Sequence, residues 1–184
     1  MKLARLTYAL NHVYILGISA VLLGAYGVQF IAGEYPCPLC VLQRMGMMLA
    51  AMGAVMNIVR GPKTSHFALA IIGALIGASI SARQILLHIA PDDPGYGSPV
   101  LGMHMYSWAF VVFVVVIALC ALHLLDEADF AQSSPPPSLR AFSKFTLGLF
   151  ALIILCNAVT VFCEAGFHWF LPANPDSYRL FSGN

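Results

Sequence analysis

Five long apolar stretches constrain the fold of this chain more than any other feature of its sequence. Each approaches the roughly 20 residues that a helix needs to cross the hydrocarbon core of a bilayer. Only 9% of the residues are charged, whereas a soluble domain typically carries about 25%. Backbone polar groups inside lipid must be paired within the chain, which favours helices over open strands. The sequence therefore predicts an all-α integral membrane helical bundle, with spans at about Tyr8–Ile31, Val41–Val59, His66–Ala90, Tyr106–Leu125 and Phe142–Phe162.

The basic residues predict how these spans are oriented, because positive charge gathers on the cytoplasmic side of membrane proteins. They lie before the first span, between the second and third, and around the start of the fifth, at Lys2, Arg5, Arg60, Lys63, Arg140 and Lys144. Five crossings then place the N-terminus in the cytoplasm and the C-terminus on the outer side. The first span is too long for the apolar region of a signal peptide, so we expect it to be retained.

A short segment rich in proline and serine separates the fifth span from the other four. Residues 133–138 read Ser-Ser-Pro-Pro-Pro-Ser, a composition typical of a semi-extended linker. We therefore expect a four-helix unit over residues 1–128 and a cytoplasmic linker over 129–141. A fifth transmembrane helix and an outer tail would follow over 142–184.

Two cysteines at C-x-x-C spacing are the strongest candidates for chemistry. Cys37 and Cys40 lie where the second span begins, on the outer side, where an oxidising compartment permits disulfides. The N-terminus of a helix favours a thiolate, and a thiol with a lowered pKa is a better leaving group. A zinc site would need about four ligands, and no second tight ligand pair accompanies the outer histidines. We therefore interpret the pair as redox-active and expect no bound metal.

Two arginines inside the apolar spans are candidates for contact with a polar ligand. Arg44 lies four residues after Cys40 and so shares its helix face, one turn deeper. Arg83 lies in the third span, beside Gln84 and five residues before His88. Charged residues in such segments are costly and usually functional, although Arg44 could instead extend toward the outer interface. Paired histidines can also ligate haem, but those of this chain lie near helix ends, where such rings often rest at the interface.

The segment around the cysteine pair carries a family resemblance. From Cys37 to Arg44 it reads C-P-L-C-V-L-Q-R and resembles the motif C-x-x-C-x-x-[EQ]-R of the disulfide bond formation protein B (DsbB) family. Residues 81–84, Ser-Ala-Arg-Gln, followed by His88, are similar to the corresponding third-helix segment. The resemblance extends in order and spacing over about residues 1–125.

This resemblance implies both a fold and a reaction. The fold would be a four-helix bundle in a bacterial inner membrane. The reaction would pass electrons from a periplasmic, thioredoxin-like (DsbA-like) thiol oxidase to ubiquinone or menaquinone. Cys37 and Cys40 would form the quinone-coupled disulfide, and Arg44 would sit at the quinone head group. Arg83 and His88 would be further cofactor-binding residues.

The second outer loop departs from the family pattern. Family members normally carry there a second cysteine pair that exchanges with the soluble partner, whereas residues 91–105 of this chain contain no cysteine. Cys163, at the outer end of the fifth span, is the best candidate for a third redox thiol. Cys156 lies seven residues earlier, about 10.5 Å along a helix and beyond the roughly 7 Å between Cα atoms that a disulfide can span. Cys120 and Cys156 are most simply small packing residues.

The sequence therefore predicts a quinone-coupled thiol–disulfide oxidoreductase in which a periplasmic thiol attacks the Cys37–Cys40 disulfide directly. The alternative is a non-catalytic membrane subunit or adaptor that kept the bundle and binds quinone or lipid. The cysteine-free second loop favours this alternative, whereas the intact set of Cys37, Cys40 and Arg44 favours the enzyme. A transporter has less support, since no acidic residue inside the spans and no broken-helix pair marks a transport path.

Overall fold

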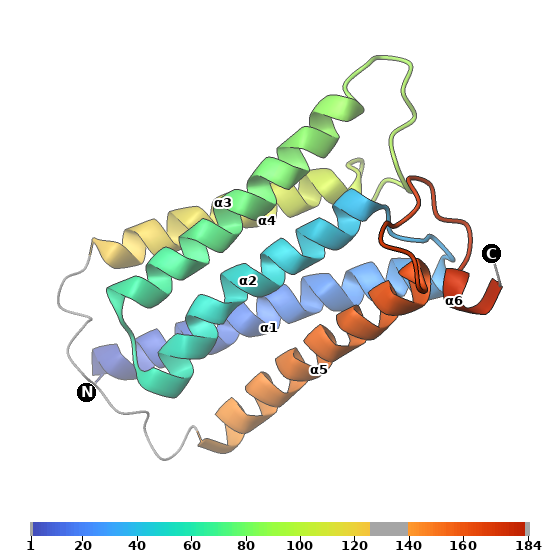
Figure 1. Cartoon of the computed structure of the whole chain (residues 1–184). Coiled ribbons are helices and arrows are strands. Elements are labelled where there is room, and N and C mark those ends of the chain that lie inside the picture. Colours follow the sequence, from blue (N-terminus) through green and yellow to red (C-terminus); the bar gives the residue numbers. More distant parts are fainter. Residues whose placement is uncertain (1, 126–139, 183–184) are drawn as a thin grey trace.

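The structure is a bundle of long helices (Figure 1). It is a computed structural model that describes residues 2–125 and 140–182. Five helices in these ranges are long and apolar enough to cross a membrane, so the predicted all-α membrane bundle is confirmed. A further helix, α6, is a single turn in the C-terminal tail that no apolar pattern predicts. The end of the bundle that carries this tail and the cysteine pair is called the outer end below, after the predicted orientation. The helices are α1 (Lys2–Ile31), α2 (Pro38–Arg60), α3 (Thr64–Leu87), α4 (Met105–Leu124), α5 (Arg140–Ala165) and α6 (Arg179–Ser182).

The predicted linker lies almost wholly outside the described residues. Of residues 129–141, the structure describes only Arg140 and Ala141, which begin α5. The proposed division into a four-helix unit, a linker and a fifth helix therefore stays a prediction.

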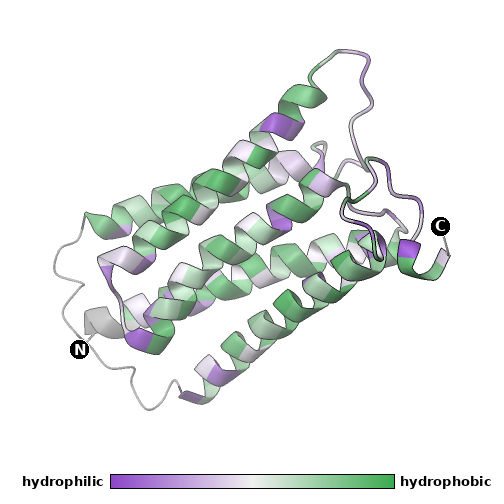
Figure 2. Ribbon diagram, in the orientation of Figure 1, coloured by the Kyte–Doolittle hydropathy of each residue, from purple (hydrophilic) through white to green (hydrophobic). Residues whose placement is uncertain are grey.

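Apolar side chains cover the outside of the bundle as well as its core (Figure 2). Val13, Leu75, Val115 and Leu155, from four different helices, are all exposed. Such a surface is expected in lipid, because lipid tails are as apolar as the side chains that face them. The polar residues gather mostly toward the two ends of the bundle.

The central helix is α2, which contacts each of the other four long helices. Small residues let it approach α3 closely. A Cβ atom added at Gly73 would lie 2.6 Å from the backbone nitrogen of Ala50, and one added at Gly46 would lie 2.9 Å from the Cα atom of Gly77. Close backbone approach of this kind provides the van der Waals contact that holds membrane helices together. It also brings the outer ends of α2 and α3 side by side.

One face of α5 packs against α1 and α2. The ring nitrogen Nε2 of His12 lies 2.9 Å from Oγ of Ser143, and the Tyr26 hydroxyl donates a 3.5 Å hydrogen bond to Oδ1 of Asn157. These contacts tie α5 to α1 at two levels of the bundle. The buried residues of α5 recur at helical spacing, at Thr146, Phe150, Ile153, Asn157 and Glu164.

A polar cluster joins three helices at the inner end of the bundle. Asn57 of α2 donates a 3.0 Å hydrogen bond to Oδ1 of Asn11 on α1. Its own Oδ1 accepts from the backbone N–H of Lys63 at 3.3 Å and lies 3.0 Å from Nδ1 of His66 on α3. All three side chains are buried, and together they fix the short turn between α2 and α3.

The second outer loop, residues 88–104, folds over the outer end of the bundle (Figure 1). The Tyr96 hydroxyl donates a 2.7 Å hydrogen bond to the Tyr35 carbonyl oxygen. The backbone N–H of Ser98 donates to Oε2 of Glu34 at 3.1 Å. Both contacts fasten the loop to the segment just before the cysteine pair.

Candidate dithiol site

Cys37 caps the N-terminus of α2, and Cys40 lies in the first turn of that helix. The backbone at Cys37 is extended, with φ −67° and ψ 163°, and Pro38 follows at the first helical position, which suits proline. The backbone N–H of Cys40 donates a 3.2 Å hydrogen bond to Sγ of Cys37. Both thiols are free; Cys37 is only 5% exposed and Cys40 is half-buried. The predicted pair thus lies within reach of helix-terminal N–H groups.

The Cys37 thiol holds its proton more tightly than an ordinary cysteine. Hydrogen bonding with the Cys40 sulfur and then burial raise the pKa of Cys37 above its usual range. Arg44, in turn, acts electrostatically on Cys40. The arrangement therefore favours a proton on Cys37.

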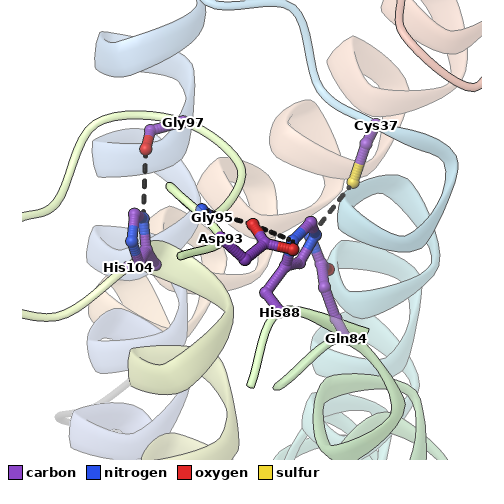
Figure 3. Close-up of polar contacts among 7 residues, drawn as sticks. All are labelled: Cys37, Gln84, His88, Asp93, Gly95, Gly97 and His104. Atoms are coloured by element: carbon purple, nitrogen blue, oxygen red, sulfur yellow. Dashed lines mark hydrogen bonds and ion pairs between the residues drawn. The ribbon is translucent and has the colours of Figure 1, made fainter. Parts of the chain in front are cut away.

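A glutamine from α3 donates toward both sulfurs, and Figure 3 shows it pointing at Cys37. Nε2 of Gln84 lies 3.3 Å from Sγ of Cys37 and 3.7 Å from Sγ of Cys40. Its Oε1 accepts a 2.8 Å hydrogen bond from Gln43 of α2. Gln84 is 1% exposed, so the contact lies in a dry site where a hydrogen bond to charged sulfur is strong. Sequence reasoning placed Gln84 beside Arg83 without giving it a role.

Arg44 is buried by the protein and anchored to α1. It is 8% exposed. One terminal nitrogen donates a 2.6 Å hydrogen bond to Oε1 of Gln29, and the other donates a 3.3 Å bond to the Ala25 carbonyl oxygen. The guanidinium carbon lies 5.0 Å from the centroid of the Tyr26 ring, within cation–π range. Arg44 is therefore held inside the bundle one turn below Cys40.

A cavity of about 90 Å³ opens beside the pair. Cys40, Gln43 and Arg44 of α2 contribute polar groups to its lining, as does Glu34. Aromatic residues from the outer segments and α4 line the rest together with small apolar residues of α1, and the aromatic ones are Tyr35, Tyr96, Tyr106 and Trp108. A flat, mostly apolar ring with polar oxygen atoms fits such a lining, because Arg44 and Gln43 offer N–H donors and most of the other lining residues are apolar or aromatic.

The other two predicted cofactor-binding residues lie outside this cavity lining. His88 is half-buried, with Nδ1 3.0 Å from Oδ1 of Asp93 (Figure 3), and its ring stacks on Tyr106 at 5.6 Å between centroids. Backbone hydrogen bonding from Gly95 and then the bond with His88 lower the pKa of Asp93. Arg83 is exposed on α3. The structure thus brings Cys37, Cys40 and Arg44 together. His88 stacks on Tyr106, which lines the cavity. Contact of Arg83 with a cofactor stays a prediction.

The remaining cysteines are separate from the pair. Cys163 is half-buried at the outer end of α5, Cys156 is exposed on the same unbroken helix, and Cys120 is half-buried near the inner end of α4. All three are free thiols. A redox role for Cys163 therefore stays a prediction.

These observations define a multi-pass, all-helical membrane protein with a dithiol at the outer mouth of one helix. The family model described as "Disulfide bond formation protein DsbB" matches residues 7–98. Disulfide bond formation protein B 1 of Pseudomonas fluorescens (strain Pf0-1) is 30% identical over 148 residues, which cover 61% of this chain and 87% of that protein. Disulfide bond formation protein B of Chromobacterium violaceum is 38% identical over 84 residues, 41% of this chain and 51% of the relative. No solved structure gives a significant match.

The chain therefore belongs to the DsbB family. This confirms the resemblance drawn from the motif around Cys37 and the third-helix segment, and it supports an oxidoreductase role in disulfide bond formation. The chain is a divergent member, because its second outer loop, residues 88–104, contains no cysteine.

Proposed function

We propose that the protein is a quinone-coupled thiol–disulfide oxidoreductase that forms disulfides in periplasmic proteins through the Cys37–Cys40 pair. The observation that carries this proposal is the shared cavity, in which Cys40 and Arg44 line one wall. A sulfur that changes charge and a buried cation that stabilises its anion lie together there. The walls also fit the head group of ubiquinone or menaquinone.

The residues of the chain divide the work of the cycle. The Cys37–Cys40 disulfide accepts two electrons from a pair of substrate thiols, which become a disulfide. Gln84 donates to both sulfurs, and Arg44 stabilises negative charge on Cys40. A bound quinone supplies the acceptor for two electrons and two protons. Arg44 and Gln43 orient it, and the aromatic walls keep water away from the sulfur that faces the cavity. We further propose that Arg83 and His88 contribute to cofactor binding, His88 through its contact with Tyr106.

The proposed orientation places the dithiol in the periplasm of a bacterial inner membrane, with the N-terminus in the cytoplasm and the C-terminus outside. A thioredoxin-like, DsbA-like thiol protein is the proposed partner. Since residues 88–104 hold no cysteine, the partner's thiol must reach the Cys37–Cys40 bond itself. Cys37 is buried, and Tyr96 fastens the second outer loop to Tyr35, two residues before Cys37. The proposed attack therefore requires this loop to move aside.

The second candidate is a non-catalytic membrane subunit or adaptor that binds quinone or lipid. The observation that favours it is the missing cysteine pair of the second outer loop. In that case Cys37 and Cys40 would stay free thiols whether the membrane quinones were oxidised or reduced.

Quinone reduction by the purified full chain, with a reduced thioredoxin-like protein as donor, tests the proposal. We expect Cys37→Ser and Cys40→Ser each to abolish turnover, because neither variant can form the disulfide. Cys156→Ser, a change at an exposed thiol on α5, is the matched control and should keep the wild-type rate. Turnover that persists in both single variants of the pair would exclude the mechanism, and bound quinone without turnover in any protein would favour the adaptor.

A further inference from the structure

An acidic side chain of α5 is buried at the outer end of the bundle without a partner. Glu164 is 0% exposed. Among the residues that the structure describes, neither of its carboxylate oxygens has a hydrogen-bond partner. An unpaired buried carboxylate is costly as an anion, so a group of this kind requires an explanation.

The helical register of α5 turns this residue inward. Glu164 continues the buried face of Thr146, Phe150, Ile153 and Asn157, whereas its neighbours Phe162 and Phe167 are exposed. α5 packs against α1 and α2 along this face. Glu164 is thus directed into the bundle, toward the part of α2 that carries the dithiol site.

The carboxyl group interacts electrostatically with that site. Among the described residues, Arg44, Cys40 and Tyr96 are coupled electrostatically to this carboxyl group. The hydrogen bonds of Arg44 go to two neutral groups, Gln29 and Ala25. Among the described residues, therefore, no anion is bonded directly to the Arg44 guanidinium. The net charge around Arg44 then depends on nearby groups that can become anions.

A redox cycle at this site creates a charge problem. In the disulfide state the sulfurs are neutral, and buried Arg44 has no bonded anion among the described residues, since Glu34, which also lines the cavity, is bonded to Ser98. In the dithiol state a thiolate on Cys40 supplies one negative charge. A second permanent anion would then leave the site with excess negative charge in a medium of low dielectric constant, where such an imbalance is expensive.

We propose that Glu164 is a redox-linked proton site: it binds a proton when the Cys37–Cys40 disulfide is reduced and releases it when the disulfide re-forms. Arg44 then faces one negative charge in each state, from the Glu164 carboxylate or from the Cys40 thiolate. This inference rests on the proposed redox cycle of the pair. α5 lies beyond residues 7–98 of the family match. The proposal therefore assigns this helix a role in the redox cycle.

The proposal balances in both half-reactions. Two substrate thiols lose two electrons and two protons and become a disulfide, while the Cys37–Cys40 bond breaks. One proton stays on Cys37, the other binds Glu164, and Cys40 remains a thiolate. When the bond re-forms, Cys37 and Glu164 release these two protons and the sulfurs give up two electrons, which together convert a quinone to a quinol. The net charge of the site is unchanged throughout.

Other titratable groups surround this end of α5 and must be separated from Glu164 in any test. They lie on α1, in the segment before α2, on α2, in the second outer loop and at α6, and are Tyr26, Glu34, Cys40, Arg44, Tyr96, Tyr178 and Arg179. Burial, and after it the negative charges of the cysteines and of Glu164, raise the pKa of Tyr96. Tyr96 therefore keeps its proton throughout the neutral range.

The reduction equilibrium of the pair as a function of pH tests the proposal without any quinone present. The purified full chain is equilibrated in redox buffers of defined potential and the free thiols are trapped by alkylation. Each proton bound on reduction changes the equilibrium constant tenfold per pH unit, equal to about 29.6 mV for a two-electron couple. We expect a hundredfold change per pH unit in the wild type and a tenfold change in Glu164→Gln. Asp92→Asn, which removes an exposed outer carboxylate, is the control and should keep the hundredfold dependence.

Equal pH dependence in wild type and Glu164→Gln would overturn the inference. A pair that cannot be reduced and reoxidised at all contradicts the proposed function as well, so the two failures are distinguishable. Infrared difference spectra of the wild type (reduced minus oxidised) cover the case in which Glu164→Gln does not fold. A protonated carboxyl band that appears on reduction supports the inference, and a spectrum without such a band overturns it.

Discussion

Gln84 shows how a single uncharged residue can control the dithiol. Its amide nitrogen donates toward both sulfurs from α3, and its amide oxygen accepts from Gln43. These contacts fix the orientation of the amide group, with the nitrogen toward the sulfurs. A hydrogen bond to a charged group contributes about 1.5–3 kcal/mol. The glutamine is therefore placed to stabilise thiolate character more than thiol or disulfide.

We expect Gln84→Leu to slow quinone reduction by about tenfold or more, since roughly 1.4 kcal/mol of lost thiolate stabilisation corresponds to a factor of ten. The expected change is in kcat rather than in KM for the thiol donor. Steady-state kinetics with the purified protein measure it. Ser79→Ala, at an exposed position of the same helix, is the control and should behave as wild type; an unchanged kcat in Gln84→Leu would remove the glutamine from the mechanism.

At the scale of the helix, the sequence predicts features that depend on neighbouring residues of the chain. It does not predict features that depend on how the helices pack. The bounds of the last four spans agree with the helices to within about three residues, and α1 begins earlier than predicted, at Lys2 instead of Tyr8. About 20 apolar residues are sufficient to define a membrane helix. Arg83 and Gln84 show the limit. Adjacent residues of a helix point about 100° apart, and only the packing of α3 against α2 decides that Gln84 faces the sulfurs. The inward face of α5 and its Glu164 were missed for the same reason, although Thr146, Asn157 and Glu164 at helical spacing in an apolar run were an available signal.

The contact between helices at the inner end gives a stability prediction. Asn57 joins α1, the turn before α3, and α3 itself through three polar contacts. Single hydrogen bonds between membrane helices contribute about 0.6–1.7 kcal/mol. We expect Asn57→Leu to lower the free energy of unfolding by about 1–3 kcal/mol, because its loss also leaves buried partners unsatisfied.

Thermal unfolding of the protein in detergent, followed by circular dichroism, measures this loss. Ser65→Ala, an exposed change in the first turn of α3, should leave the midpoint unchanged. A midpoint for Asn57→Leu equal to that of the wild type would show that the cluster does not hold the inner end together.

At the scale of the whole molecule, the bundle separates two tasks across the membrane. The inner end carries the structural polar cluster, whereas the outer end carries the dithiol, the cavity and the loop that covers them. α2 joins the two ends and contacts every other long helix. In the proposed function the bundle uses one redox pair, Cys37 and Cys40, which both a partner's thiol and a quinone would have to reach.

A single-turnover experiment tests this account most directly. The purified protein is reduced, freed of reductant and mixed with one equivalent of a soluble quinone, and its free thiols are then alkylated and mapped by mass spectrometry. We predict that Cys37 and Cys40 become protected as one disulfide while one quinone per protein is reduced, with Cys156 still alkylated. Free Cys37 and Cys40 after complete mixing with the quinone would contradict the account.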